Sequence, residues 1–246
     1  MNIPADEALL ARLTIARGRS TPVADDPRRR SLSLILGHRG LSTTHLENSL
    51  DAFRAALAAG MDGFELDVQP TRDGVCRVLH DETLERTALA GGILRQMNAA
   101  ELPGLKNGEP VPRLSDALQL PALRVNVELK GRPGWKPALA AVESANALDR
   151  VLFSSFEHRE ILQLWTACPE ARCGFLWETP EARVLTAAAL ADLPPALWLH
   201  IPLEALQHRP GFWAPFASRL AAWGMRSAAE AQILPFEPAI VIADAL

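Results

Sequence analysis

Eight strand-like segments follow one another along the chain, and helix-like segments lie between most of them. This alternation is typical of an α/β protein whose parallel strands are joined by crossover helices. Eight such units in 246 residues predict a (β/α)8 TIM barrel, with functional groups at the carboxyl ends of the strands. A doubly wound open sheet is the main alternative. The strand-like segments are SLSLILGHR (31–39), DGFELDVQ (62–69), LRVNVELK (123–130), RVLFSSF (150–156), RCGFLW (172–177), ALWLHIP (196–202), MRSAAEA (225–231) and AIVIAD (239–244).

The chain is expected to form an N-terminal helix and linker over residues 1–30, followed by the barrel over 31–246. The helix itself is predicted at 5–17, where it would cover the groove between the eighth and first strands. The turn signal at 71–74 makes VCRVLHD the returning arm of a hairpin after the second strand. A Gly- and Pro-rich stretch, 82–113, is then a short insertion before the next helix.

The composition argues against several classes of protein. A net charge of −4 from 25 basic and 29 acidic residues indicates no nucleic-acid-binding surface. The sequence contains no run of 18 consecutive apolar residues, so no membrane span is predicted. The first 30 residues do not resemble a secretory signal. Cys76, Cys168 and Cys173 match no zinc pattern and are interpreted as reduced thiols. We therefore expect a cytoplasmic protein without stable membrane insertion; the oligomeric state stays open.

Carboxylates stand in two of the predicted strands, where unpaired charges are costly to bury. Glu65 and Asp67 alternate with apolar residues in GFELDVQ, so their side chains share one direction. The third strand ends in VNVELK, which places Glu128 and Lys130 on one side. Carboxylates this close together raise one pKa or require a cation. The set Glu65, Asp67 and Glu128 suits a hard divalent cation, Mg²⁺ or Ca²⁺.

Basic and titratable residues are predicted at the same rim. The first strand ends in GHRG, which delivers His38 and Arg39, and His80 closes the hairpin. Arg39 and Lys130 supply fixed positive charge for an anionic oxygen. The two histidines can exchange protons near neutral pH. A cation site, two basic side chains and two histidines together favour a phosphodiester-cleaving site.

The sequence resembles the glycerophosphodiester phosphodiesterases, which are similar to the phosphatidylinositol-specific phospholipases C. The matching residues are colinear from about 34 to 156: GHRG (37–40), EN (47–48), GFELDVQPTRDG (63–74), VLHDETLERT (78–87), PRLSDAL (112–118), VNVELK (125–130) and SSF (154–156).

The resemblance implies a role for each matching residue. It implies that Glu65, Asp67 and Glu128 bind the metal, and that His38 and His80 are the acid/base pair. Arg39 and Lys130 then contact phosphate, and Glu47 supports the site from the loop after the first strand. The implied reaction is hydrolysis of a small-molecule glycerophosphodiester to glycerol 3-phosphate and an alcohol, through a cyclic intermediate.

The chain also departs from the family pattern. His45 and Leu46 precede Glu47 where the family has Pro, and WGMRSAAEAQ stands where a Val-x-x-Trp-Thr-Val-Asn-like segment is usual. Asp244, in the ending AIVIADAL, matches the Asp of the family's ending. Two alternatives stay open: a catalytically weakened phosphodiester-binding relative, and a lysophospholipase D-type activity. Among the other histidines, His200 is the one retained as a candidate site residue.

Overall fold

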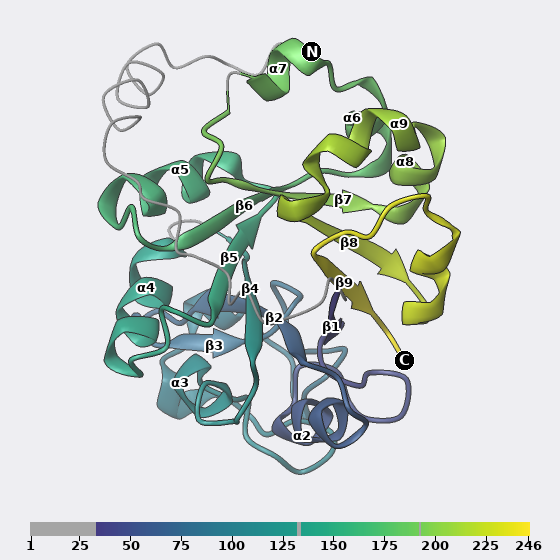
Figure 1. Cartoon of the computed structure of the whole chain (residues 1–246). Coiled ribbons are helices and arrows are strands. Elements are labelled where there is room, and N and C mark those ends of the chain that lie inside the picture. The colour runs from purple at the N-terminus through teal and green to yellow at the C-terminus, as the bar shows by residue number, and fades with distance from the viewer. Residues whose placement is uncertain (1–32, 132–133, 192) are drawn as a thin grey trace.

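The structure is a computed structural model that describes residues 33–131, 134–191 and 193–246. Within these residues, eight strands run parallel, and the pairing of the first with the second closes them into a barrel. This confirms the predicted (β/α)8 fold. Figure 1 shows the strands around a central axis with helices at the periphery. The barrel strands are β1 (Leu34–Gly37), β2 (Gly63–Pro70), β4 (Arg124–Leu129), β5 (Val151–Ser155), β6 (Arg172–Leu176), β7 (Trp198–Pro202), β8 (Leu220–Met225) and β9 (Ile240–Ala243). A ninth strand in the described residues, β3 (Cys76–Val78), pairs antiparallel with β2 outside the barrel.

The helices follow the strands as the alternating sequence pattern predicts. In α2, Ser49 accepts a hydrogen bond from the backbone N–H of Ala52 at the start, and Gly60 follows the end with φ +95°. Phe53 of this helix stacks on Phe64 of β2, with ring centroids 4.3 Å apart. The α-helices are α2 (Leu50–Ala58), α3 (Leu114–Ala117), α4 (Trp135–Ser144), α5 (His158–Ala167), α6 (Thr179–Val184), α7 (Ala187–Ala191), α8 (Leu203–His208) and α9 (Pro210–Trp213). The 3-10 helices are η1 (Leu94–Gln96), η2 (Ala99–Glu101), η3 (Ala214–Arg219) and η4 (Ala228–Ile233).

The hairpin expected after the second strand is present, because β3 pairs antiparallel with β2. The excursion that follows, residues 82–113, packs around its own small core. This second core, which we call the excursion core, contains buried Leu79, Leu84, Ala88, Leu94, Leu105 and Val111. Leu46, from the loop after β1, packs against it. The residue that replaces the family's proline therefore connects that loop to the excursion.

The predicted seventh strand was wrong in position. The strand is β8 (Leu220–Met225), whereas MRSAAEA was predicted and η4 occupies most of that segment. Alanine and glycine in LAAWGM have low β propensity, but tertiary pairing with β7 and β9 overrides that preference. Ser227 then starts η4 by accepting a hydrogen bond from the N–H of Ala229. As a result Trp223 lies within a barrel strand.

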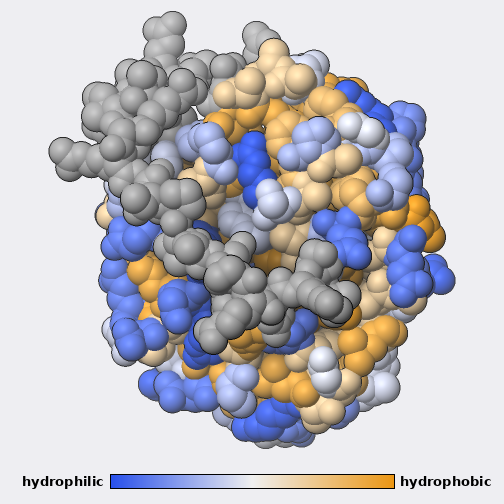
Figure 2. All heavy atoms as spheres, in the orientation of Figure 1, coloured by the Kyte–Doolittle hydropathy of each residue, from blue (hydrophilic) through white to orange (hydrophobic). Residues whose placement is uncertain are grey.

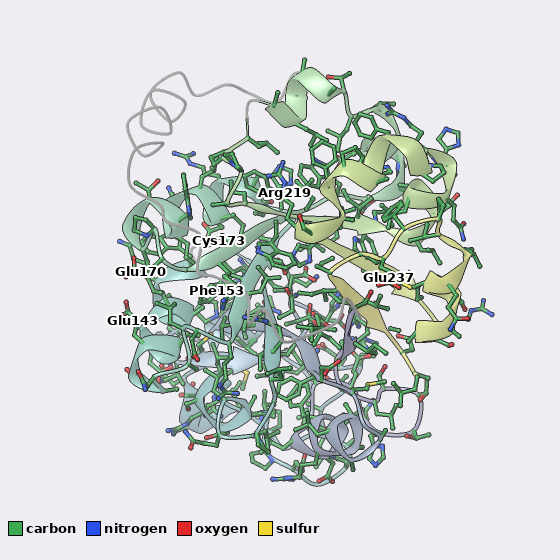
Figure 3. The ribbon with its side chains drawn as sticks, in the orientation of Figure 1. Glu143, Phe153, Glu170, Cys173, Arg219 and Glu237 are labelled. Atoms are coloured by element: carbon green, nitrogen blue, oxygen red, sulfur yellow. The ribbon has the colours of Figure 1, made fainter. Side chains whose placement is uncertain are left out.

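The main core lies between the outer faces of the strands and the helices. Phe153 and Cys173, register partners on β5 and β6, are both fully buried there, and Figure 3 labels them beside the ribbon centre. Glu143 and Glu170 lie at the outer edge in the same view. Figure 2 shows apolar and charged side chains interspersed over the visible face. None of the helices in the described part of the chain has the length and apolar character to cross a bilayer. The helix predicted at 5–17 lies outside the described residues.

Candidate active site

Three buried carboxylates converge inside the barrel. Asp67 of β2 pairs in register with Glu128 of β4, and Glu65 precedes Asp67 by two residues on the same face. One carboxylate oxygen from each lies within 4.8 Å of the others. All three residues are less than 9% exposed. The sequence prediction that these three side chains meet is thus matched by the geometry.

Burial of like charges makes these carboxylates costly to ionise. Burial and the neighbouring charge of Asp67 raise the pKa of Glu65 to about 8 and that of Glu128 to about 7. A hard divalent cation is the ligand that such an oxygen set accommodates, since it compensates the repulsion directly. The donor chemistry therefore fits a Mg²⁺ or Ca²⁺ ion held by Glu65, Asp67 and Glu128.

The GHRG turn after β1 brings Arg39 against this cluster. A side chain at Gly40 would place its Cβ 2.6 Å from the backbone of Ala52, and φ there is +84°, so the turn requires glycine. The backbone N–H of Arg39 donates to Glu65 Oε2 at 2.9 Å. Its guanidinium donates to Glu47 Oε1 at 2.8 Å and lies 3.4 Å from Asp67 Oδ2. Contacts with these three carboxylates thus fix Arg39 in place, so it is not a free surface charge.

Asn48 fixes Asp67 from the same loop. Its Nδ2 donates to Asp67 Oδ2 at 2.8 Å, while its Oδ1 accepts from the backbone N–H of Asp67 at 3.2 Å. Asn48 itself has φ +56°, a left-handed conformation that asparagine tolerates better than most residues. The EN pair therefore contributes two side chains with different roles, one on Arg39 and one on Asp67.

Lys130 and two aromatic residues form another wall of the site. Lys130 Nζ makes an ion pair with Glu128 and lies 3.5 Å from Asp67 Oδ1. It also lies 5.6 Å from the ring centroid of Phe156, which contacts Trp223 edge-to-face at 5.9 Å. Because β8 starts five residues earlier than predicted, a tryptophan does reach this wall. Phe156 is 37% exposed, so the aromatic pair presents apolar surface beside the basic residue.

His38 extends from β1 and is held by the end of β9. Its Nδ1 lies 2.8 Å from Asp244 Oδ1. Burial lowers the pKa of His38, but the hydrogen bond to Asp244 and the charge of Glu65 outweigh burial and raise it above its ordinary value. The imidazole is 40% exposed. With Nδ1 engaged by a carboxylate, Nε2 is the nitrogen available to a substrate.

His80 likewise has a carboxylate partner. Its Nδ1 lies 2.7 Å from Asp81 Oδ1, and the imidazole is 31% exposed. Gln69 holds the backbone here, because its Nε2 faces the carbonyl oxygens of Leu79, His80 and Asp81 at 2.6–3.1 Å. The ring and the main chain of His80 are therefore fixed separately.

The structure brings most of the predicted residues into one connected group. Arg39, Glu47 and Lys130 contact the carboxylate cluster or each other, whereas His80 reaches it only through Asp81, Arg86 and Glu47 among the described residues. His200 lies elsewhere: it is fully buried, and a Cβ on Gly174 would come within 2.7 Å of its ring. Burial lowers the pKa of His200 to about 3, so it is a neutral core residue.

Sequence reasoning assigned no role to Asp81, Arg86 or Gln69. Asp81 stands beside His80 in VLHDETLERT, and the adjacency alone could have indicated a carboxylate partner. Arg86 is in the same motif, but its partner Glu47 is 39 residues away. That contact depends on the path of the excursion, which local sequence patterns do not reveal.

The fold and the site define a (β/α)8-barrel protein whose buried carboxylate cluster fits a divalent cation and lies against two basic side chains. Comparison with known proteins identifies the family. A family model described as the glycerophosphoryl diester phosphodiesterase family matches residues 38–229. The chain belongs to this family.

Curated relatives cover part of the chain. A glycerophosphodiester phosphodiesterase from Caldanaerobacter subterraneus subsp. tengcongensis is 34% identical over 163 residues, covering 59% of this chain and 67% of the relative. One from Bacillus altitudinis is 36% identical over 148 residues, covering 52% and 59% respectively. This chain therefore spans about two thirds or less of the length of these relatives.

Solved structures match over a longer range. A glycerophosphodiester phosphodiesterase from Thermotoga maritima is 26% identical with a TM-score of 0.70, covering 88% of this chain and 96% of that one. A phosphodiesterase from Oleispira antarctica, solved in complex with the product sn-glycerol-3-phosphate, is 24% identical with a TM-score of 0.70. It covers 87% of this chain and 93% of that one. At 24% identity, the similarity to the Oleispira antarctica structure shows that the two proteins share the fold and shows no more than that.

Proposed function

We propose that this chain hydrolyses glycerophosphodiesters to glycerol 3-phosphate and an alcohol, with a divalent cation and with His38 and His80 as the acid/base pair. The observation that carries the proposal is the pairing of each histidine with its own carboxylate, in a barrel that also gathers Glu65, Asp67 and Glu128 into one buried acidic cluster. Family membership supports the reaction type. The product complex of the Oleispira antarctica phosphodiesterase supports glycerol 3-phosphate as the retained half.

The basic residues bind the phosphate in this proposal. Arg39 and Lys130 each lie next to the acidic cluster, so a phosphate there meets positive charge from two strands. Burial opposes their protonation, but nearby Asp67, Glu47 and Glu128 raise the pKa of both, so they stay charged throughout the working pH range. A cation held by Glu65, Asp67 and Glu128 would supply Lewis-acid stabilisation of the negative charge on the phosphate and on the attacking hydroxyl.

The histidines transfer the protons. In the first half-reaction the 2-hydroxyl of glycerol loses its proton to Nε2 of one histidine and attacks phosphorus, which gives a cyclic phosphate. The other histidine protonates the departing alkoxide. In the second half-reaction a water loses its proton to the latter histidine and opens the ring, and the former returns its proton to the 2-hydroxyl. The carboxylates Asp244 and Asp81 keep Nδ1 of each ring engaged throughout.

Turnover of defined substrates tests the proposal. Purified protein is incubated with glycerophosphocholine, glycerophosphoethanolamine or glycerophosphoinositol in EDTA, Mg²⁺ or Ca²⁺, and released glycerol 3-phosphate is measured. We expect release that requires the cation and that is lost in His38→Ala and in His80→Ala. Absence of release from every substrate with either cation would refute the proposal and favour a binding protein.

A second candidate is a lysophospholipase D-type activity on the same site. It is favoured by the exposed Phe156 ring and its contact with Trp223, which could accept one acyl chain beside Lys130. A lysophospholipid in the same assay, with lysophosphatidate as the measured product, distinguishes it from the first. We also propose that the protein acts in the cytoplasm, which the three free, buried cysteines support.

A further inference from the structure

Arg86 lies in the excursion and joins two carboxylates at the rim of the site. Its Nε donates to Asp81 Oδ2 at 2.6 Å and its Nη2 donates to Asp81 Oδ1 at 3.1 Å. On its other edge, Nη1 donates to Glu47 Oε2 at 2.6 Å and Nη2 donates to Glu47 Oε1 at 2.8 Å. Both carboxylates are therefore held bidentately by one planar guanidinium, which is the strong geometry for this pair.

Each of these carboxylates has a second partner in the proposed active site. Glu47 accepts from Arg39, which also contacts Asp67, and Asp81 is the partner of His80. The result is a chain of alternating charges between the cation site and the second histidine. In order, its members are Asp67, Arg39, Glu47, Arg86, Asp81 and His80.

We propose that Arg86 is a positioning residue that fixes the ring of His80 through Asp81 and couples it to the phosphate-binding Arg39 through Glu47. The inference rests on the proposed function, since it presumes that His80 transfers a proton. Arg86 itself touches neither reacting group in the described structure. Without it, Asp81 would keep one partner, His80, and would be free to turn toward solvent with it.

The electrostatics agree with this geometry. The hydrogen bonds from Arg86, followed by that from His80, hold the pKa of Asp81 well below its usual range. Burial opposes ionisation of Glu47, but Arg86 and Arg39 lower the pKa of that carboxyl. Both carboxylates thus stay charged throughout the range in which a histidine titrates. Glu47 and Asp81 therefore remain charged acceptors for Arg86 under working conditions.

The backbone of Arg86 is anchored, so its side chain starts from a fixed point. Lys106 Nζ donates to the carbonyl oxygens of Glu85 and Arg86 at 3.0 and 2.8 Å. Leu84 is fully buried in the excursion core, against which Leu46 of the Glu47 loop also packs. The two loops that supply Glu47 and Arg86 therefore share one hydrophobic core. An isolated surface ion pair contributes little to stability. This network differs because its contacts are bidentate and the loops that carry them pack on a shared hydrophobic core.

The first test is a set of single variants. Lysine keeps the charge at position 86 but cannot reach both carboxylates bidentately, so Arg86→Lys and Arg86→Ala should both lower kcat. We expect a loss of about 10- to 100-fold, the scale of a small misplacement of a reacting group. Arg95→Ala is the matched control, because Arg95 is an exposed arginine of the same excursion paired with Glu82. Its kcat should stay within about twofold of the wild type, as expected for a surface pair.

The second test asks whether Arg86 acts through Asp81. In an Asp81→Asn background, Arg86→Ala should lower kcat by less than about twofold further, because neighbours in one network are not additive. A purely structural role for Arg86 would lower the melting temperature and give effects on kcat that multiply. That result, or a kcat of the single variants within twofold of the wild type, would overturn the inference.

The third test does not depend on turnover. Nitrogen-15 shifts of the His80 ring, assigned with His80→Ala, report which nitrogen carries the proton in the neutral form. The wild type should show Nδ1–H as the single tautomer, and Arg86→Lys, which retains the aliphatic stem and the positive charge, should show a mixture. An unchanged tautomer would overturn the inference. If the wild type cleaves no substrate while the tautomer shifts, the proposed function fails and the inference that Arg86 orients the His80 ring survives.

Discussion

Removal of the divalent cation should make the stability of the fold fall steeply between pH 5 and pH 8. The main cause is Glu65, whose pKa is about 8 in the folded chain against an ordinary value of 4.5; Glu128, whose pKa is raised to about 7, acts in the same direction. Between these values the folded state without a cation holds a proton that the unfolded state releases, so its stability decreases as pH rises. Each pH unit within the window costs about 1.4 kcal/mol. Allowing for partial titration at its lower edge, Glu65 alone accounts for a loss of about 3 to 4 kcal/mol from pH 5 to pH 8, and Glu128 adds to it.

Chemical denaturation of the protein in EDTA at a series of pH values measures this slope. For a chain of this size the loss corresponds to a fall of about 6 to 16 °C in Tm. With saturating Mg²⁺ or Ca²⁺ the carboxylates are deprotonated and paired, so the slope should disappear. The cation should also add about 2.7 kcal/mol when its concentration is 100 times its Kd.

Two variants isolate the contribution of Glu65. Glu65→Gln should flatten the profile in EDTA, raise stability at pH 8 and remove the stabilisation by cation. Glu160→Gln is the matched control, because Glu160 is also buried but accepts from the N–H groups of Gly134 and Trp135, outside the acidic cluster. If wild-type protein and Glu65→Gln gave parallel profiles in EDTA, the account of the cluster would be refuted.

Three further predictions concern turnover. His38→Ala and His80→Ala should each reduce kcat by about 10²- to 10⁴-fold, the usual contribution of a general acid or base, and retention of most wild-type kcat would disprove the assignment. Asp244→Asn removes the charge that raises the pKa of His38, so one limb of the pH–kcat profile should move to lower pH. The acidic limb moves if His38 is the base and the basic limb if it is the acid; an unmoved profile would contradict the pairing. Trp223→Ala removes the aromatic contact with Phe156 and should raise KM by about 2- to 10-fold. The increase should be largest for a substrate with an apolar alcohol group, and an unchanged KM for every substrate would contradict this prediction.

The parts of the fold that could be predicted from sequence are those with strong local patterns. Runs such as LILG and IVIA contain β-branched and large apolar residues, and they form β1 and β9. The carboxylate cluster was also predictable, because alternation places Glu65 and Asp67 on one face of their strand and the parallel barrel places Glu128 on the neighbouring strand. Both predictions use local patterns together with the regular strand order of a barrel.

The remainder depends on contacts between distant segments. β8 was misplaced because Ala221, Ala222 and Gly224 give no strand signal, and its neighbours impose the pairing. The link from Glu47 to Arg86 requires the loop after β1 and the excursion to meet over the excursion core. Neither feature could be predicted from periodicity, since each is a product of tertiary packing.

Barrel closure has different consequences for the two halves of the site. The acidic cluster needs only β2 and β4, which are neighbours in the sheet. His38 and Asp244, by contrast, are 206 residues apart and directly follow β1 and β9, whose last residues Gly37 and Ala243 are register partners. The histidine acquires its carboxylate only when the last strand has docked against the first. The acidic cluster can therefore form from two neighbouring strands, whereas the contact that orients His38 requires closure of the barrel.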